Sequence, residues 1–242
     1  MEEITKVCFG IQARSTSSRF PGKILKEIEP GKSMLRVVID NVDSSAFYLN
    51  RRADRTRVNA TVAVLVPKGD PAVKIAQQRS IVIEGSEYDV LSRYYELAER
   101  MDSDYVVRIT ADCPMVPPWL MSDHILIAVK RGYDYCSNVF EAVRTALDGH
   151  DVEVISRAAI KWAHENATEP SDREHVTTIL RSAKRPAWMK VGCVMHRVDE
   201  SHIKKSVDTP EELERAKDEL RRLKEKMILA EHMFGKDHVH KI

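Results

Sequence analysis

The sequence lacks the features that mark membrane, secreted or nucleic-acid-binding chains. No apolar run reaches the ~18 residues of a membrane span, and the opening Met-Glu-Glu-Ile-Thr-Lys has neither the basic region nor the cleavage signal of a secretory leader. The formal net charge over 242 residues is only +1, so no overall field attracts nucleic acid or an anionic membrane. We therefore expect a soluble, cytoplasmic protein without a nucleic-acid or membrane partner, in which any anion site is local.

Cysteine is scarce and scattered. The four cysteines are Cys8, Cys113, Cys136 and Cys193, and no two of them form a Cys-x-x-Cys pair. Each lies in or beside an apolar stretch, where a free thiol behaves as a small hydrophobe. We expect reduced, structural cysteines, which suits a reducing compartment. The sequence also has no histidine spacing typical of a metal site and no Gly-x-Ser-x-Gly motif that would indicate acyl transfer.

Strands and helices alternate along the first half of the chain. Apolar runs that end in polar loops predict buried strands, and apolar residues at a 3.6-residue period predict helices. The strands are expected at 7–13, 61–66, 80–83 and 104–110, and the helices at 34–42, 71–79, 88–101 and 118–131. This alternation indicates an α/β fold with a mostly parallel sheet, in which ligands bind at the carboxyl ends of the strands.

The second half of the chain is less regular. The elements expected there are a half-exposed strand at 151–155, helices at 156–166 and 173–184, a strand at 189–196, and a helix from 208 or 209 to about 233. Ser156 is a candidate cap for the first of these helices, and Asp208 or Thr209 for the last. The polar, arginine-rich stretch 44–57 is expected to form a loop or a ragged helix end.

A cationic loop follows the first predicted strand. Arg14, Arg19 and Lys23 lie within ten positions, together with three serines and Gly22. Charged and hydroxyl donors in a loop of small residues suit a triphosphate. The loop has neither the P-loop spacing nor the Gly-x-Gly-x-x-Gly fingerprint. A solvated, basic surface loop is the alternative interpretation.

Several acidic residues are candidates for a site with this loop. Asp112 follows a predicted buried strand and suits Mg²⁺, which prefers one or two carboxylates with phosphate oxygens and water. A turn-capping role before Pro114 is the alternative, and for Asp208 the alternative is a helix N-cap. The polar stretches 148–153 and 172–175 would contact a polyhydroxylated or carboxylated substrate, or else be solvated.

Four stretches of the chain, taken together, resemble the cytidylyltransferases that activate acidic sugars. They lie at 11–25, at 107–114, at 151–154 with 173–177, and at 206–213. That family includes the 3-deoxy-manno-octulosonate and acylneuraminate cytidylyltransferases, and the resemblance is strongest to the branch named after the spore coat polysaccharide biosynthesis protein SpsF. It implies a single Rossmann-like, three-layer α/β/α domain of the nucleotide-diphospho-sugar transferase type over 1–242, usually dimeric. Within it, 138–185 is expected to bind the acceptor or form the dimer, and 209–235 to form a C-terminal helix.

The resemblance also implies a reaction. CMP is transferred from CTP to an acidic sugar with release of pyrophosphate, in the presence of Mg²⁺, for cell-surface polysaccharide biosynthesis. The expected partners are therefore CTP, an acidic sugar and a second copy of the chain. A nucleotidyltransferase with another acceptor, such as a phosphonate or sugar phosphate, or with another nucleotide, is one alternative. A non-catalytic member of the fold that binds nucleotide is another.

Individual roles follow from the positions that match the family's motifs. Nucleotide contacts are expected from Ala13, Arg14, Ser18, Arg19, Lys23, Gly85, Ser86, Asp89, Arg93, Arg108 and Asp112. Metal ligation is expected from Asp112 and Asp208, which with Arg14 and Lys23 form the expected catalytic set. Acceptor contacts are expected from Asp151, Glu153, Arg173 and His175. The turn 66–70 departs from the family's small, acidic turn, which leaves the choice of base open.

Overall fold

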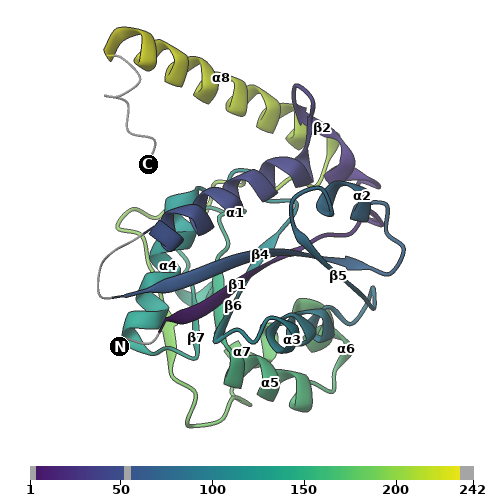
Figure 1. Ribbon diagram of the computed structural model, residues 1–242, viewed down its shortest axis with the longest axis vertical. Coiled ribbons are helices and arrows are strands. Elements are labelled where there is room, and N and C mark those ends of the chain that lie inside the picture. Colours follow the sequence, from purple (N-terminus) through teal and green to yellow (C-terminus); the bar gives the residue numbers. More distant parts are fainter. Residues whose placement is uncertain (1–3, 52–55, 235–242) are drawn as a thin grey trace.

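A seven-stranded sheet runs through the middle of the computed structural model, which describes residues 4–51 and 56–234 (Figure 1). Its strands are β1 (Thr5–Gln12), β4 (Val58–Pro67), β5 (Ile81–Gly85), β6 (Tyr105–Thr110), β7 (Tyr135–Ser137), β8 (Glu153–Ser156) and β9 (Val191–Cys193). The order across the sheet is β5-β4-β1-β6-β8-β7-β9. The strand β8 runs antiparallel to β6 and β7, whereas the other neighbouring pairs are parallel.

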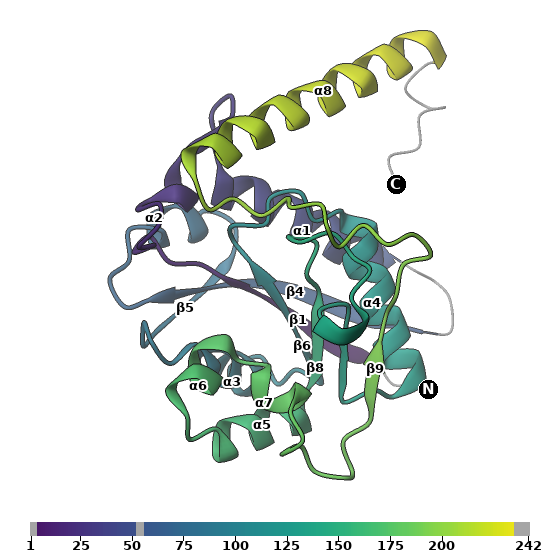
Figure 2. The same cartoon turned by 180° about the vertical axis from the view of Figure 1, so that it is seen from behind.

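Helices cover both faces of this sheet (Figures 1 and 2). One face carries α1 (Met34–Arg51), α2 (Val73–Ala76) and α4 (Pro118–Arg131). The other carries α3 (Val90–Arg100), α5 (Arg157–Asn166), α6 (Pro170–His175) and α7 (Thr178–Arg181). The mostly parallel, three-layer α/β/α fold expected from the sequence is therefore confirmed.

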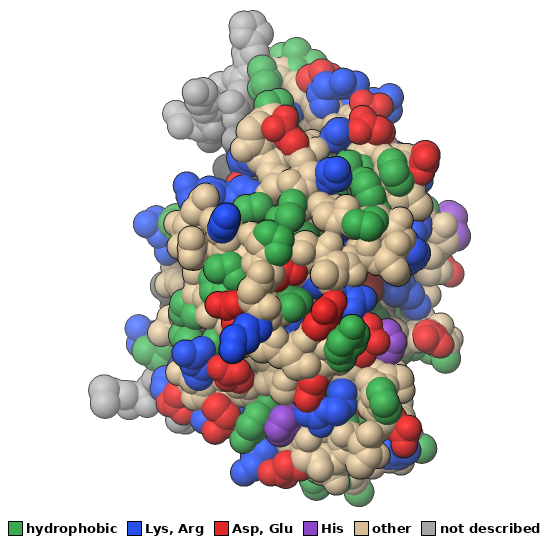
Figure 3. Space-filling model, turned by 90° about the vertical axis from the view of Figure 1, so that its right-hand side faces the viewer, with side chains coloured by type: hydrophobic (Ala, Val, Ile, Leu, Met, Phe, Trp, Pro, Cys, Tyr) green, Lys and Arg blue, Asp and Glu red, His purple; other side chains and the backbone are tan. Residues whose placement is uncertain are grey.

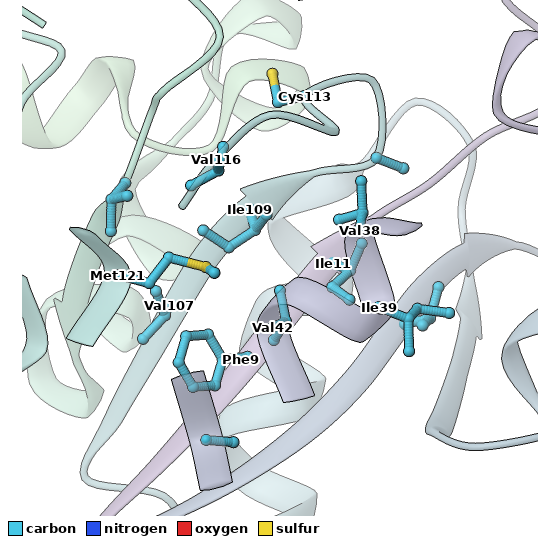
Figure 4. Packing of buried hydrophobic residues seen from close by; sticks show 14 of the residues in the cluster. Phe9, Ile11, Val38, Ile39, Val42, Val107, Ile109, Cys113, Val116 and Met121 are labelled. Atoms are coloured by element: carbon cyan, nitrogen blue, oxygen red, sulfur yellow. The ribbon is translucent and has the colours of Figure 1, made fainter. Parts of the chain in front are cut away.

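Alternate residues of β1 pack into the hydrophobic cores on the two faces of the sheet, because successive side chains of a strand point to opposite faces. Phe9 and Ile11 pack towards α1 and α4 (Figure 4), and full burial of such a side chain contributes about 1.5–3 kcal/mol. On the other face, Gly10 lies under α3. A Cβ there would lie 2.6 Å from the ring of Tyr94, whose hydroxyl donates to the Gly10 carbonyl. Glycine therefore lets α3 approach β1 closely.

The first helix is longer than the sequence predicts. It continues past residue 42 to Arg51, so the expectation of a loop or ragged end from residue 44 is wrong for 44–51. Ser45, Ala46 and Leu49 are buried on its inner face, and this packing holds the extra turns. Residues 52–55 of that stretch lie outside the described residues.

The single helix expected over 173–184 is wrong as well. It is replaced by α6 and α7, which are separated at Val176, where φ is +64°. This conformation is rare for a β-branched residue. The Val176 side chain is fully buried in the core beneath α3 and α5, so burial of an apolar side chain accompanies the break.

The strand at 151–155 was expected to be half-exposed, yet all four residues of β8 are buried. The reason is its position between β6 and β7, with helices on both faces. By contrast, Ser156 caps α5 as expected, since its side chain accepts a hydrogen bond from the Ala159 amide at 3.1 Å.

A hairpin of β2 (Glu27–Glu29) and β3 (Lys32–Ser33) follows the short helix η1 (Lys23–Leu25), and η2 (Glu141–Val143) lies in a later loop. The long helix α8 (Pro210–Phe234) packs Leu213 and Ala216 against Ile28 of the hairpin. At its start Thr209 and Glu212 form a reciprocal capping box, so Thr209 is the cap and the Asp208 side chain is not required for it. Residue 235 of the expected helix lies outside the described residues, among which no helix is long and apolar enough to cross a membrane.

Candidate functional site

A polar cavity of about 230 Å³ lies at the carboxyl ends of β1 and β6. Because these strands are adjacent and parallel, Gln12 and Thr110 lie side by side at the rim. The lining residues are Gln12, Arg14, Ser17, Ser18, Arg19, Lys23, Ile24, Arg108, Thr110, Ala111 and Asp112. The structure thus brings together six of the expected nucleotide contacts. Figure 3 faces this end of the strands and shows basic and acidic side chains interleaved across its middle.

Lys23 is the central cation of the site. Its ammonium nitrogen donates to Asp112 Oδ2 at 2.7 Å, to Asp208 Oδ1 at 2.9 Å and to the Val207 carbonyl at 2.8 Å. Only 7% of the side chain is exposed. Burial by itself would lower the pKa of Lys23, but the two carboxylates outweigh burial and raise this pKa above its ordinary value. Lys23 is therefore charged at neutral pH.

Asp208 is surrounded by cations. Besides Lys23, it pairs with Arg19 at 3.0 Å and with Lys204 at 3.0 Å. Burial would raise the pKa of Asp208, yet hydrogen bonds from Lys23 and Lys204 lower it below the ordinary value. The Val207 amide also donates to the Asp112 carbonyl at 2.9 Å, which ties the segment before α8 to the end of β6. The two expected metal carboxylates are therefore neighbours.

The donor set fits a divalent cation that is shared with phosphate oxygens. Asp112 lines the cavity with 31% of its side chain exposed, whereas both oxygens of Asp208 already bind cations. Among the described residues, no three His, Cys, Asp or Glu side chains gather in a way that would hold a metal by themselves. Mg²⁺ commonly binds through one or two carboxylates plus substrate phosphates. Asp112 meets this need directly, and Asp208 would join after releasing one of its cations.

Arg108 lies on β6 and lines the cavity, and residues outside the cavity hold its side chain in place. Its Nη1 donates to Glu153 of the neighbouring β8, and the Tyr135 hydroxyl donates to the other oxygen of Glu153. Glu153 is 1% exposed. Burial would raise the pKa of Glu153, but the charge of Arg108 outweighs it and lowers that pKa. Glu153 therefore supports Arg108 and does not line the cavity.

The other expected nucleotide contacts, at Ala13, Gly85, Ser86, Asp89 and Arg93, lie outside the lining of the cavity. Asp89 caps α3 by accepting from the Ser92 amide at 3.0 Å, and its own amide donates to Ser86 Oγ at 3.1 Å. Arg93 is buried, with its stem against Gly85. Ala13 is also buried, and its amide donates to the Leu65 carbonyl at 3.0 Å.

Two of the three remaining acceptor candidates, Arg173 and Asp151, have structural partners of their own. Arg173 pairs with Asp89 at 2.7 Å and donates to the His164 carbonyl at 3.1 Å, so it joins α6 to α3 and α5. Asp151 pairs with Arg144 at 2.6 Å, and burial raises the pKa of this carboxyl. His175 is exposed at the end of α6.

The individual nucleotide contacts expected from the sequence do not include Gln12, Ser17 or Thr110, which line the cavity. The amide oxygen of Gln12 is buried and has no hydrogen-bond partner among the described residues. A polar residue that ends an apolar strand at the ligand-binding edge of a sheet is a signal that would have identified Gln12 and Thr110. Ser17 has no such signal beyond its place in the cationic loop.

This fold and this site, with cations and two carboxylates at the strand ends, define a nucleotidyltransferase-type α/β protein. Residues 9–234 match the family model described as "Cytidylyltransferase". The chain belongs to this family.

Two curated relatives match in sequence. The uncharacterized protein MJ1063 of Methanocaldococcus jannaschii is 30% identical over 172 residues, which are 70% of this chain and 65%, just under two thirds, of that protein. The spore coat polysaccharide biosynthesis protein SpsF of Bacillus subtilis is 29% identical over 216 residues, which are 87% of this chain and 85% of that protein.

Solved structures share the fold. A cytidylyltransferase from Leptospira borgpetersenii has a TM-score of 0.79 at 22% identity, covering 98% of this chain and 100% of that one. CMP:2-keto-3-deoxy-manno-octonic acid synthetase, complexed with CTP, has a TM-score of 0.62 at 18% identity, covering 90% and 100%. Rv0371c from Mycobacterium tuberculosis, in complex with manganese, has a TM-score of 0.53 at 18% identity, covering 89% and 98%.

Proposed function

We propose that this chain transfers CMP from CTP to a hydroxyl of an acidic sugar and releases pyrophosphate, with Mg²⁺ bound at Asp112 and Asp208. The observation that carries the proposal is the position of Lys23, which joins both carboxylates at the edge of a cavity lined by Arg14 and Arg19. Family membership supports the nucleotide, since CTP is also present in the solved synthetase complex. The manganese complex of Rv0371c supports a divalent cation.

The reaction requires little covalent chemistry from the protein itself. The sugar hydroxyl attacks the α-phosphorus in line, the bond to the bridging oxygen breaks, and pyrophosphate leaves with the electron pair. Arg14, Arg19 and Lys23 would neutralise the charge on the leaving group, and the hydroxyl of Ser18 would orient it. When bound, the metal supplies further charge neutralisation and lowers the pKa of the attacking hydroxyl.

Arg14 would change partners when the nucleotide binds. It pairs with Glu174 of α6 at 3.4 Å, with 38% and 40% of the two side chains exposed. Such an exposed ion pair contributes at most about 1 kcal/mol, so a triphosphate, with more charge and more acceptor oxygens, would displace Glu174. Arg19 pairs with Asp208, but its side chain is 70% exposed, so it would leave this pair to follow the phosphates.

Arg108 would bind a sugar carboxylate or a phosphate, with Glu153 as its support, while Asp151, Arg173 and His175 stay acceptor-side candidates. The relative SpsF, by its name a polysaccharide biosynthesis protein, favours a role in making a cell-surface polysaccharide. We further propose a cytoplasmic homodimer, with 138–185 as the acceptor-binding or dimerisation region.

A pyrophosphate-release screen tests the proposal. The four nucleoside triphosphates are combined with a panel of acidic sugars, with and without Mg²⁺, and Asp112→Asn serves as the inactive control. We expect release with CTP and at least one acidic sugar, only when Mg²⁺ is present. Release with another nucleotide, a phosphonate or a sugar phosphate would identify a different enzyme of the same fold. Absence of pyrophosphate release with every combination of nucleotide and acceptor would contradict the proposal that the chain is an enzyme.

Thermal unfolding provides a cheaper companion measurement. A ligand that binds the folded chain alone raises its melting temperature in proportion to ln(1 + [L]/Kd). CTP in excess should therefore raise the melting temperature more than ATP, GTP or UTP. Equal shifts for all four would contradict selectivity for cytosine.

A further inference from the structure

Asp208 pairs with three cations through its two carboxylate oxygens. Lys23 and Arg19 both lie near Oδ1, at 2.9 Å and 3.0 Å, whereas Lys204 lies 3.0 Å from Oδ2. Departure of Arg19 would leave Oδ1 with Lys23, and departure of Lys23 would leave it with Arg19. Of these three departures, only that of Lys204 vacates an oxygen completely. A divalent cation that binds Asp208 therefore has most to gain from displacing Lys204.

A second carboxylate is already in contact with Lys204. The ammonium nitrogen lies 2.7 Å from Glu212 Oε1, which is closer than its 3.0 Å contact with Asp208 Oδ2. An ammonium group has three donors on a flexible stem, so it can turn from one acceptor to another. Lys204 can therefore leave Asp208 without becoming an unpaired charge, because Glu212 retains it.

Lys23 is held more firmly than Lys204. Its side chain is 7% exposed, and its nitrogen donates to Asp112, to Asp208 and to the Val207 carbonyl. Its departure would leave two neighbouring carboxylates to repel each other. The Lys204 side chain is 36% exposed, so water can take the place of the bond that it gives up. Lys204 is thus the cation that leaves at the lower cost.

Glu212 is fixed in the position that receives Lys204. Its other oxygen, Oε2, accepts from the Asp208 amide at 2.6 Å and from the Thr209 amide at 3.1 Å, as part of the capping box that begins α8. The backbone of Lys204 is held as well, since its carbonyl accepts from Arg215 at 3.3 Å. The exchange of partners therefore requires movement of the Lys204 side chain alone.

We infer that Lys204 is a positioning residue, which holds Asp208 Oδ2 while the site is empty and releases it to the divalent cation by withdrawing to Glu212. This inference rests on the proposed function, in which Asp208 is a metal ligand. Two opposite consequences follow. Lys204 competes with the metal for Oδ2, so its removal strengthens metal binding. Glu212 competes with Asp208 for Lys204, so removal of the Glu212 charge weakens metal binding.

The test is the affinity for Mn²⁺ alone, measured from the electron paramagnetic resonance signal of the free ion. Mn²⁺ is titrated into the wild type, Lys204→Met and Glu212→Gln. A partly exposed ion pair changes an equilibrium constant by about fivefold. We therefore expect Lys204→Met to bind Mn²⁺ about fivefold more tightly than the wild type, and Glu212→Gln about fivefold more weakly.

Both variants should fold, which thermal unfolding without metal checks. In Lys204→Met, Asp208 still pairs with Lys23 and Arg19. In Glu212→Gln, the capping box persists, because glutamine serves in it as glutamate does.

Lys205→Met is the matched control. It removes the same charge from the next position of the chain, where the side chain pairs with Glu219 and not with Asp208. Its affinity for Mn²⁺ should equal that of the wild type.

The order of affinities decides the outcome. Weaker binding in both Lys204→Met and Glu212→Gln is the signature of a purely structural role and would overturn the inference. Unchanged binding in both, tighter binding in Lys205→Met as well, or no binding of Mn²⁺ by the wild type would also overturn it. Failure of the inference alone leaves pyrophosphate release by the wild type intact. Failure of the proposed function abolishes that release while the order of Mn²⁺ affinities holds.

Discussion

Lys23 and Asp208 form a buried ion pair across 185 positions of the sequence, with 2.9 Å between Nζ and Oδ1. The same nitrogen lies 2.7 Å from Asp112. Two carboxylates this close would repel each other without a cation between them. Lys23 therefore keeps the proposed metal ligands together in the absence of a metal, and the geometry of the site is formed before the substrate arrives.

Replacement of Lys23 by methionine should destabilise the fold in a pH-dependent way. Removal of one partner of a buried pair costs about 3–5 kcal/mol, and we expect the lower end because Arg19 and Lys204 still face Asp208. The pKa of Lys23 in the folded chain is raised. Its contribution to the free energy of unfolding is therefore complete below pH 10.5 and is lost as the pH rises through the folded pKa. The folded pKa of Asp208 is lowered, so its contribution is present above pH 3.8 and is lost as the pH falls through the folded value.

Urea unfolding of the wild type and Lys23→Met from pH 3 to pH 9 measures this dependence. The difference in unfolding free energy should be constant from about pH 5 to pH 9 and should shrink below about pH 4. Lys217→Met, which removes an exposed pair with Glu214, is the control and should cost at most about 1 kcal/mol at any pH. A difference that grows as the pH falls would contradict the assignment.

Asp112→Asn should lower turnover by a factor of about 10² or more, because the amide keeps the shape of the side chain but loses the charge that binds the metal. The folded structure should survive, since the Asp112 side chain is 31% exposed. Pyrophosphate release and thermal unfolding measure the two effects. Asp218→Asn, on the exposed side of α8, is the matched control. Full activity of Asp112→Asn would mean that Asp112 is only a turn residue.

Glu153→Gln should unfold more easily than the wild type by about 3 kcal/mol, because it removes the buried counter-charge of Arg108, whose side chain is only 15% exposed. Addition of Arg108→Met to this variant should restore much of the loss, since no unpaired charge remains. Chemical unfolding of the four members of the cycle gives the coupling energy. Additive losses in the double variant would show that Glu153 and Arg108 act independently.

Gly149→Ala should disturb the segment that carries Asp208. Gly149 has a φ of +96°, and a Cβ there would lie 2.4 Å from the Ser206 amide nitrogen. The 205–206 backbone would have to move, so we expect lower stability and a lower affinity for CTP. Gly132→Ala, at a φ of +61° with open space around it, should cost only the ~1–2 kcal/mol of a left-handed backbone and leave CTP affinity intact. Equal effects of the two variants would exclude a link between Gly149 and the site.

The sequence predicts what depends on local pattern and on strand ends. Buried runs place β1 and β6, and the rule that parallel strands end at one edge brings Lys23 towards Asp112. The Arg108–Glu153 pair could not be predicted from the sequence, because it depends on β8 lying antiparallel beside β6. The alternation at 151–155 indicates an exposed face instead. The break between α6 and α7 at Val176 could not be predicted either, since the positive φ of Val176 is imposed by packing and opposes the residue's own backbone preference.

The distance along the chain between Lys23 and Asp208 also has a consequence during synthesis on the ribosome. A domain folds as a unit, so the cavity is complete only after Val207 and Asp208 have followed β1, β4 and β6 out of the ribosome. Until then Lys23 and Asp112 lack the second carboxylate. Under the proposed function, tight binding of a metal-bound nucleotide would therefore begin only after the segment before α8 has docked.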